Sequence, residues 1–304
     1  MGFDRSVMTR LRQTRFSAAV RKSPTVTHFA QRWWFRSQFD YCMKICSEIG
    51  RPQGAECQVE LPPVDVPSLD EMVAKLPDLV LGGEHFSEEM SEWCRTSKFL
   101  SYTARKDSVG YQDVYARILK NLRGKPIRML EIGIGVNKGT GLDPTDMSAL
   151  EVVHGPGDSL SGWSGYFPDA EIHGADVDRR VLVDTERYKT HFVDQLDPAS
   201  IRNLARNLGG QFDLVVDDGL HTPEANFNVM AVFLPLIKPH GVMTVEDISP
   251  EFDPLWLAAA DRLPPSYHLN YFPSVVLRQY RGARAQTSMA VITRKGQIGR
   301  SLVG

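Results

Sequence analysis

Residues 212–248 read FDLVVDDGLHTPEANFNVMAVFLPLIKPHGVMTVEDI. Two short apolar runs, at 214–216 and 242–245, are typical of buried parallel strands. Between them, Thr222 and the proline after it predict a helix start, because a hydroxyl N-cap followed by proline suits a first helical turn. The helix is expected over 225–237 and is predicted to end at the KPHG sequence that follows. The stretch therefore predicts a strand–helix–strand unit.

Each of the two apolar runs ends in an acidic pair. The first run is followed by Asp217 and Asp218, and the second by Glu246 and Asp247. In a strand–helix–strand unit both pairs emerge at the carboxyl edge of the sheet, which is where open α/β sheets bind ligands. A bound cation would relieve the repulsion among these carboxylates. His221, three residues after Asp218, is a candidate catalytic residue, although a loop histidine that caps the next helix is the simpler alternative.

A second ligand-binding signal lies upstream, where residues 127–135 read IRMLEIGIG. This pattern predicts a buried strand that runs into a glycine turn at Gly133 and Gly135, where the backbone can approach a ligand closely. A dinucleotide fingerprint would need a third glycine at a set spacing that opens a helix at once. A long polar loop follows instead, which counts against a nicotinamide-dependent dehydrogenase.

Acidic residues also end the next two expected strands. The strand over 170–177 ends near Asp176, whose carboxylate suits a bidentate grip on a ribose diol. The strand over 190–193 is followed by Asp194 and Gln195, which could bind an adenine amino group by hydrogen bonds. For a lone acidic residue, a solvated turn position would be the simpler interpretation.

The remaining pattern completes an α/β fold. Helices are expected over 110–122, 198–208 and 254–262, and strands over 267–272 and 288–293 could form a terminal antiparallel hairpin. We therefore predict a Rossmann-like, mostly parallel sheet with helices on both faces over residues 101–304.

Residues 1–100 are predicted to form a basic, mainly helical accessory region. Residues 1–36 contain eight Arg and Lys residues and one acidic residue, Asp4. This composition is compatible with a transit peptide, and the first six residues fit a loose myristoylation pattern. The aromatic cluster WWF at 33–35 favours packing against the domain or a second subunit, because such a cluster is costly to expose. A homo-oligomer is therefore expected.

Composition limits the remaining possibilities. The chain has 304 residues and a formal net charge of −2, which gives no argument for nucleic acid or membrane partners. No apolar run approaches the roughly 20 residues that span a bilayer. The four cysteines match no zinc pattern, so buried or reduced thiols in a cytoplasmic protein are expected.

Taken in order, these motifs resemble the class I S-adenosylmethionine-dependent methyltransferases. More narrowly, the chain is similar to metal-dependent O-methyltransferases that modify macrolide sugars, the mycinamicin and macrocin type. The matching blocks are LEIGIG at 130–135, DSL at 158–160, GAD at 174–176, DQ at 194–195, DDGLH at 217–221 and VED at 245–247.

The resemblance implies a role for each matching residue. S-adenosylmethionine would be bordered by Glu131, Gly133 and Gly135, covered by Ser159 and Leu160, and held at its ribose by Asp176 and at its adenine by Asp194 and Gln195. Asp217 belongs to this cofactor side, where a structural role with hydrogen bonds to backbone amides is expected. Mg²⁺ would be bound by Asp218, Glu246 and Asp247, and His221 would be the general base.

The implied reaction is O-methylation of a sugar or a glycosylated small molecule. A metal with oxygen ligands stabilises a developing alkoxide, and a histidine accepts its proton near neutral pH. Three alternatives remain open: a metal-independent N- or O-methyltransferase, a cephalosporin-type tailoring protein, and a non-catalytic cofactor-binding module. Leu220 stands where the family usually has serine, and the loop over 136–157 is longer than the family's. The resemblance therefore does not identify the acceptor.

Overall fold

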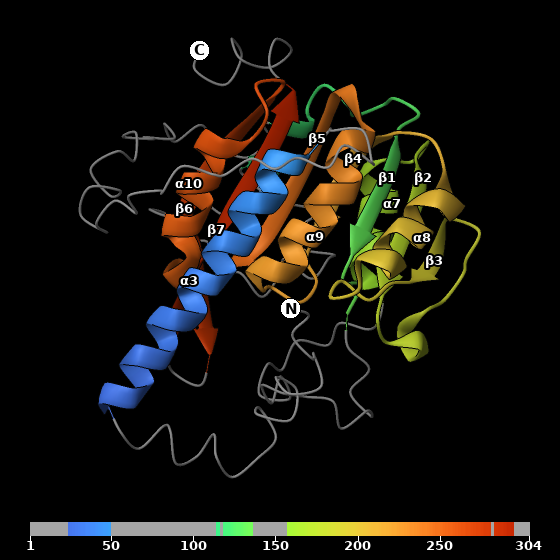
Figure 1. Cartoon of the computed structure of the whole chain (residues 1–304). Coiled ribbons are helices and arrows are strands. Elements are labelled where there is room, and N and C mark those ends of the chain that lie inside the picture. The colour runs from blue at the N-terminus through green and yellow to red at the C-terminus, as the bar shows by residue number, and fades with distance from the viewer. Residues whose placement is uncertain (1–23, 50–113, 116–117, 136–156, 281–282, 295–304) are drawn as a thin grey trace.

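The protein is seen here as a computed structural model of the whole chain (Figure 1). It describes residues 24–49, 114–115, 118–135, 157–280 and 283–294. The basic segment over 1–23, the accessory region over 50–100 and the polar loop over 136–156 lie outside the described residues, as do the side chains of the aromatic cluster at 33–35. In the part of the chain that is described, no helix is long and apolar enough to cross a membrane.

The centre of the fold is a seven-stranded sheet with strand order β3-β2-β1-β4-β5-β7-β6. The first five strands in this order are parallel, and β7 pairs antiparallel to both β5 and β6. The predicted α/β class and the terminal antiparallel hairpin are thus confirmed. The strands are β1 (Arg128–Ile132), β2 (Glu171–Asp176), β3 (Tyr188–Phe192), β4 (Phe212–Asp217), β5 (Ile237–Ile248), β6 (Tyr267–Tyr280) and β7 (Ala283–Arg294).

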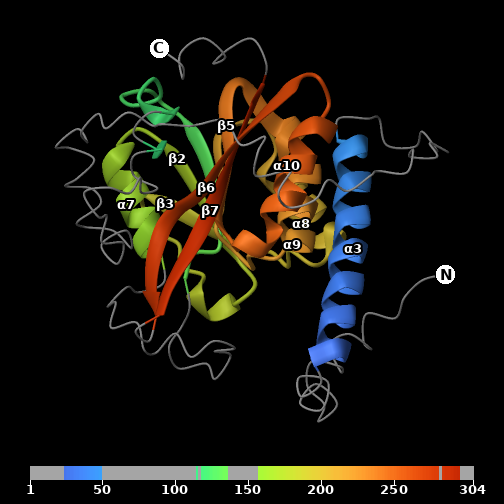
Figure 2. The same cartoon turned by 90° about the vertical axis from the view of Figure 1, so that its left-hand side faces the viewer.

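Helices cover both faces of the sheet (Figure 2). On one face lie α8, α9 and α10, and α3 packs across α9 and α10 as an outer layer. The other face carries α7 and residues 114–115 and 118–122. The α-helices are α3 (Pro24–Glu48), α7 (Asp158–Tyr166), α8 (Pro198–Leu208), α9 (Pro223–Phe233) and α10 (Asp253–Arg262). Short 3₁₀ turns occur at η3 (Arg179–Val181), η4 (Leu234–Leu236) and η5 (Pro250–Phe252).

Each face has its own apolar core. The core on the α9 side includes Phe39, Cys42, Cys46 and Met43 of α3, so this helix is part of the sheet's packing. Burial raises the pKa of the Cys46 thiol to about 12, and this thiol stays protonated at neutral pH. The core on the α7 side is built around Trp163, which is fully buried between the helix and the sheet.

The strand–helix–strand unit is confirmed, with one correction to its helix. Thr222 is the N-cap of α9, and its side chain accepts a hydrogen bond from the Ala225 amide at 3.4 Å. The helix ends at Phe233 rather than at 237, and residues 238–241 belong to β5 instead of stopping the helix. The physical reason is Pro235, whose ring clashes with the preceding turn of an α-helix and which has no amide hydrogen.

Candidate functional site

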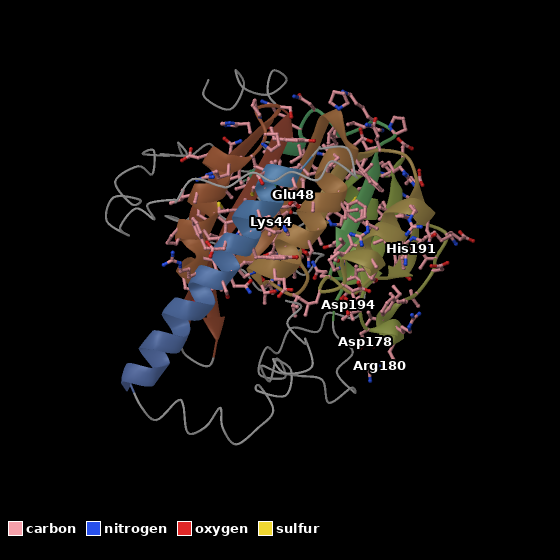
Figure 3. All side chains as sticks on the ribbon, in the orientation of Figure 1. Lys44, Glu48, Asp178, Arg180, His191 and Asp194 are labelled. Carbon is pink, nitrogen blue, oxygen red and sulfur yellow. The ribbon has the colours of Figure 1, made fainter. Side chains whose placement is uncertain are left out.

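The carboxyl ends of β1, β2, β4 and β5 meet at one edge of the sheet, the lower edge in Figure 1. All the residues predicted to bind the cofactor or the metal follow or end these strands, follow β3, or lie in α7. Figure 3 labels two carboxylates on this edge, Asp178 after β2 and Asp194 after β3. The topology thus brings the predicted site residues to a common edge, as the strand–helix–strand argument expected.

Three of these residues form a compact cluster. One ligand atom from each of Asp218, His221 and Asp247 lies within 4.8 Å of the other two. Nε2 of His221 is 3.7 Å from Oδ2 of Asp247, and the His221 side chain is 35% exposed whereas that of Asp247 is 3% exposed. Oδ1 of Asp247 accepts a hydrogen bond of 3.2 Å from the hydroxyl of Thr287 on β7. The cluster is therefore anchored in the sheet and open on the histidine side.

The donors of this cluster fit a divalent cation such as Mg²⁺. Magnesium is commonly bound through one or two carboxylates, with water and substrate oxygens completing its octahedral coordination. Asp218 and Asp247 supply two carboxylates at such a spacing. His221 lies beside them, where its imidazole could accept a proton from an acceptor hydroxyl.

The backbone at the cluster is unusual. His221 has φ 55° and Asp247 has φ 53°, and among the described residues these are the two non-glycine residues with positive φ. Such conformations cost on the order of 1–3 kcal/mol each and persist where the surrounding structure enforces them. Asp247 lies in a β-bulge of β5, between the paired positions Val245 and Ile248. Bulges re-aim side chains, which explains how Asp247 reaches the cluster.

Glu246, predicted as a third metal ligand, is not part of the three-residue cluster. It is buried, and its Oε1 accepts a hydrogen bond of 2.5 Å from the hydroxyl of Tyr115. That hydroxyl is also 2.9 Å from Oγ1 of Thr244, two residues earlier on β5. Burial raises the pKa of Tyr115 well above its usual value, and the adjacent Glu246 raises it further. Tyr115 is therefore a neutral donor that holds this carboxylate on the α7 side of the sheet.

Asp217 is fully buried beneath the loop that carries the cluster. Its carboxylate accepts hydrogen bonds from Nε2 of Gln195 at 2.7 Å, from Nδ2 of Asn226 at 2.9 Å and from the Gly219 amide at 3.4 Å. Burial raises the pKa of Asp217, and these donors oppose the shift. In this structure Asp217 binds neighbouring side chains and a backbone amide.

The glycine turn after β1 is shaped by a close approach of two loops. Gly133 has φ 90°, and a Cβ atom there would lie 2.1 Å from the backbone oxygen of Asp218. Only glycine allows this contact, so the turn and the loop bearing Asp218 are held together. Gly135 also has a positive φ of 116°, and it is exposed at the edge.

Glu131 lies in β1 next to this turn, and Ser159 and Leu160 lie in the first turn of α7. The Ser159 hydroxyl donates a hydrogen bond of 2.7 Å to Oε2 of Glu131, and both residues are buried. Leu160 is fully buried and packs on Gly174 of β2, where a Cβ would come within 2.5 Å of it. The segment predicted to cover the cofactor thus forms the start of α7.

Asp176 and Asp194 lie at the ends of β2 and β3. Asp176 accepts hydrogen bonds from the amides of Ile134 at 3.1 Å and Asp178 at 2.9 Å, which ties it to the glycine turn. Burial raises its pKa, although these amides oppose the shift. Asp194 accepts a hydrogen bond of 2.9 Å from the Leu196 amide. Val177, next to Asp176, is 59% exposed.

Tyr115 and Asn226 are the residues at this edge that sequence reasoning missed. Tyr115 is on the apolar side of a predicted helix, and no local pattern reveals that its hydroxyl reaches Glu246. Asn226 is on α9, four residues after the N-cap, where a polar residue normally faces solvent. Its burial against Asp217 depends on how the helix packs.

Comparison with known proteins supports the resemblance. Over 147 residues, the chain is 31% identical to mycinamicin VI 2''-O-methyltransferase of Micromonospora griseorubida, a match that covers 48% of this chain and 33% of that protein. The chain resembles the macrolide-sugar O-methyltransferases. It is also 30% identical to the 8-demethyl-8-alpha-L-rhamnosyl tetracenomycin-C 2'-O-methyltransferase of Streptomyces olivaceus, over 50% of this chain and 36% of that protein.

The match is partial in length. It spans about a third of each of these curated relatives. A solved structure of the methyltransferase MycE from the mycinamycin biosynthetic pathway, in complex with Mg, SAH and mycinamycin VI, is 25% identical over 61% of this chain and 49% of that one, with a TM-score of 0.43. No protein-family model matches the chain.

Proposed function

We propose that this protein is an S-adenosylmethionine-dependent, Mg²⁺-assisted O-methyltransferase. The acceptor would be a hydroxyl of a sugar or of a glycosylated natural product. The observation that carries the proposal is the cluster of Asp218, His221 and Asp247 at the carboxyl edge of the sheet. The names of the relatives support the reaction and the acceptor class, because they are O-methyltransferases of rhamnosylated or macrolide compounds.

The chemistry requires an alcohol oxygen to lose its proton as the methyl group arrives. Mg²⁺ held by Asp218 and Asp247 would supply Lewis acidity that favours the alkoxide form of the acceptor. His221 accepts the proton at its imidazole, and its neighbour Asp247 stabilises the imidazolium that results. Asp247 is buried, and the low-dielectric surroundings strengthen the electrostatic interactions of its carboxylate.

The cofactor would lie beside the cluster, along the glycine turn. Gly133 and Gly135 would allow the backbone to approach it, and Asp176 would bind its ribose diol. Because Asp176 is already tied to the turn by amide hydrogen bonds, the carboxylate is preorganised for this contact. The methyl sulfonium would then face the acceptor oxygen, and transfer would depend mainly on alignment.

The decisive experiment is a methyl-transfer assay. The protein is incubated with S-adenosylmethionine, Mg²⁺ and a panel of rhamnosylated and macrolide acceptors, and the products are identified by mass spectrometry. We expect one added methyl group on a sugar hydroxyl, and a strongly reduced rate of product formation with the His221→Ala variant. Binding of S-adenosylmethionine with no turnover of any sugar acceptor would contradict the proposed acceptor class.

A metal-independent methyltransferase is the second candidate. It is favoured by one observation: Glu246 is hydrogen-bonded to Tyr115 and does not join the cluster. In that case His221 would act as a base without a cation, and turnover would survive a chelator. The predicted homo-oligomer, the cytoplasmic location and the boundary near residue 100 stay predictions.

A further inference from the structure

The side chain of Gln195 crosses from the end of β3 to the loop that follows β4. Its Nε2 donates to Oδ1 of Asp217 at 2.7 Å, and its Oε1 accepts from the Leu220 amide at 2.8 Å. Gln195 is 7% exposed. One amide group thus joins residues 217 and 220 of the short loop 217–221, which contains two residues of the cluster, Asp218 and His221.

The orientation of this amide follows from its partners. A carboxylate accepts hydrogen bonds and a backbone N–H donates one, so the nitrogen must face Asp217 and the oxygen must face Leu220. The backbone of Gln195 is fixed as well, because its carbonyl accepts a hydrogen bond of 2.9 Å from Nδ2 of the buried Asn228 on α9. Gln195 is therefore held from α9 and in turn holds the loop.

The loop fits closely around this side chain at Gly219. A Cβ atom on Gly219 would lie 2.0 Å from Oε1 of Gln195 and 2.7 Å from its Cδ. These distances are far inside van der Waals contact, so a side chain at 219 would displace the amide or the loop. Gly219, which follows β4, thus leaves the space that the side chain of Gln195, which follows β3, occupies.

Resting on the proposed function, we propose that Gln195 is a positioning residue for the catalytic loop. Its amide sets the path of residues 217–221, and thereby the placement of His221 against Asp247. The alternative role, recognition of the cofactor's adenine, would instead make the side chain a determinant of S-adenosylmethionine affinity. The two roles predict different kinetic changes.

The first test replaces Gln195 by methionine, which keeps the volume and removes both hydrogen bonds. We expect kcat to fall about 10- to 100-fold, the loss that a small misplacement of a reacting group produces. The dissociation constant of S-adenosylmethionine, measured by calorimetry, should stay within about threefold of the unsubstituted value. A tenfold weaker cofactor with unchanged kcat would overturn the proposal in favour of adenine recognition. Asn203→Met, on the exposed side of α8, is the matched control.

A double-mutant cycle with Gly219→Ala tests the contact itself. Gly219→Ala alone should lower kcat, because its Cβ meets Oε1 of Gln195. In a Gln195→Ala background the obstacle is gone, so adding Gly219→Ala should cause no further loss. If the two losses multiply instead, the residues act independently and the proposal is wrong. Thermal unfolding is recorded for every variant, so a loss of rate that comes from unfolding is distinguished from a loss of kcat in the folded protein.

Loop positioning can also be read without turnover. Amide hydrogen exchange, followed by mass spectrometry on the peptide that contains 217–221, should be faster in Gln195→Met and unchanged in Asn203→Met. Unchanged exchange in both variants would overturn loop positioning. An unsubstituted protein that methylates no acceptor would contradict the proposed function alone, because the exchange result would still decide the role of Gln195.

Discussion

Nε2 of His221 lies 3.7 Å from Oδ2 of Asp247, and both residues have a left-handed backbone, with φ near 55° and 53°. The two residues come from different strand ends, one on the loop after β4 and the other in the bulge of β5. Each is held in a conformation that a non-glycine residue rarely adopts. Strain of this kind, repeated on both sides of one contact, favours a role in function over one in folding.

The metal mechanism predicts that a chelator stops the reaction. EDTA should abolish turnover and added Mg²⁺ should restore it, while the affinity for S-adenosylmethionine stays nearly constant. Asp247→Asn keeps the size of the side chain and removes a negative ligand, so the Mg²⁺ concentration needed for half-maximal rate should rise more than about tenfold. Full activity in EDTA would favour the metal-independent mechanism.

The general-base role predicts a large effect of His221→Ala. The rate should fall about 10²- to 10⁴-fold, because the acceptor proton loses its acceptor. Raising the pH should partly rescue this variant, since hydroxide can replace the base. His268→Ala, an exposed histidine that hydrogen-bonds Asn270 on β6, is the control and should keep the full rate.

The buried contact between Tyr115 and Glu246 predicts a loss of stability. Tyr115→Phe removes the hydroxyl that lies between Glu246 and Thr244, and the free energy of unfolding should fall by about 1–3 kcal/mol. Urea unfolding measures the change. Tyr188→Phe on β3, which is only partly buried, should change stability by less. Equal effects of the two substitutions would show that the hydroxyl contact to Glu246 contributes little.

The raised pKa of Asp176 predicts a pH dependence with a defined sign. The ordinary pKa of this carboxyl is 3.8, and the folded protein raises it. As the pH rises just above 3.8, Asp176 therefore ionises in the unfolded chain before it ionises in the folded protein. The folded state then binds more protons, so this contribution to stability falls as pH rises through the window and is constant above it. The Asp176→Asn variant has no carboxyl at this position and therefore lacks this pH-dependent contribution. The stability advantage of the unsubstituted protein over Asp176→Asn should therefore shrink between pH 4 and neutral pH in thermal unfolding.

Asp176→Ala tests the cofactor role of the same residue. Calorimetry should show weaker binding of S-adenosylmethionine, because each charge-assisted hydrogen bond contributes about 1.5–3 kcal/mol at most. Asp178→Ala, two residues later, removes an ion pair with Arg180 and provides the control. Both carboxylates lie at the same edge, and a cofactor affinity that responds equally to the two changes would argue against a specific ribose contact.

The packing of α3 predicts that this helix contributes to the stability of the sheet. Met43 is buried in the core on the α9 side, and Met43→Ala should lower the free energy of unfolding by about 2–5 kcal/mol. Its neighbour Lys44 faces solvent in an exposed pair with Glu48 at 3.9 Å (Figure 3). Lys44→Ala should change stability by no more than about 0.5 kcal/mol. Equal melting temperatures for Met43→Ala and the unsubstituted protein would contradict this role of α3.

The parts of the fold that follow local rules were predictable from sequence. The N-cap at Thr222, the apolar run of β4 and the glycine turn after β1 each depend on residues within a few positions. The meeting of Asp218 with Asp247 was also predictable, because parallel strands bring their carboxyl ends to one edge. The resemblance to macrolide-sugar O-methyltransferases was confirmed by the 31% identity over 147 residues.

Other features depend on tertiary packing and were not predictable in this way. Tyr115 contacts Glu246 across 131 positions of sequence, and the amide of Gln195 reaches Leu220 across 25. The early end of α9 was missed because the apolar pattern continues past Pro235 without a polar interruption. The whole of α7 was missed because the small and polar residues of DSLSGWSGY are typical of a loop.

Because of the bulge in β5, the cluster depends on the number of residues between 245 and 248 as well as on their identity. Two residues, Glu246 and Asp247, oppose one residue of β7 between Val245 and Ile248. Because side chains alternate along a strand, removing one residue there would restore regular pairing and turn the following side chains to the other face. A related protein one residue shorter at this site could keep every other residue of the sheet and still lose the cluster. A deletion or an insertion between 245 and 248 should therefore disrupt the cluster even where every remaining side chain of β5 is kept.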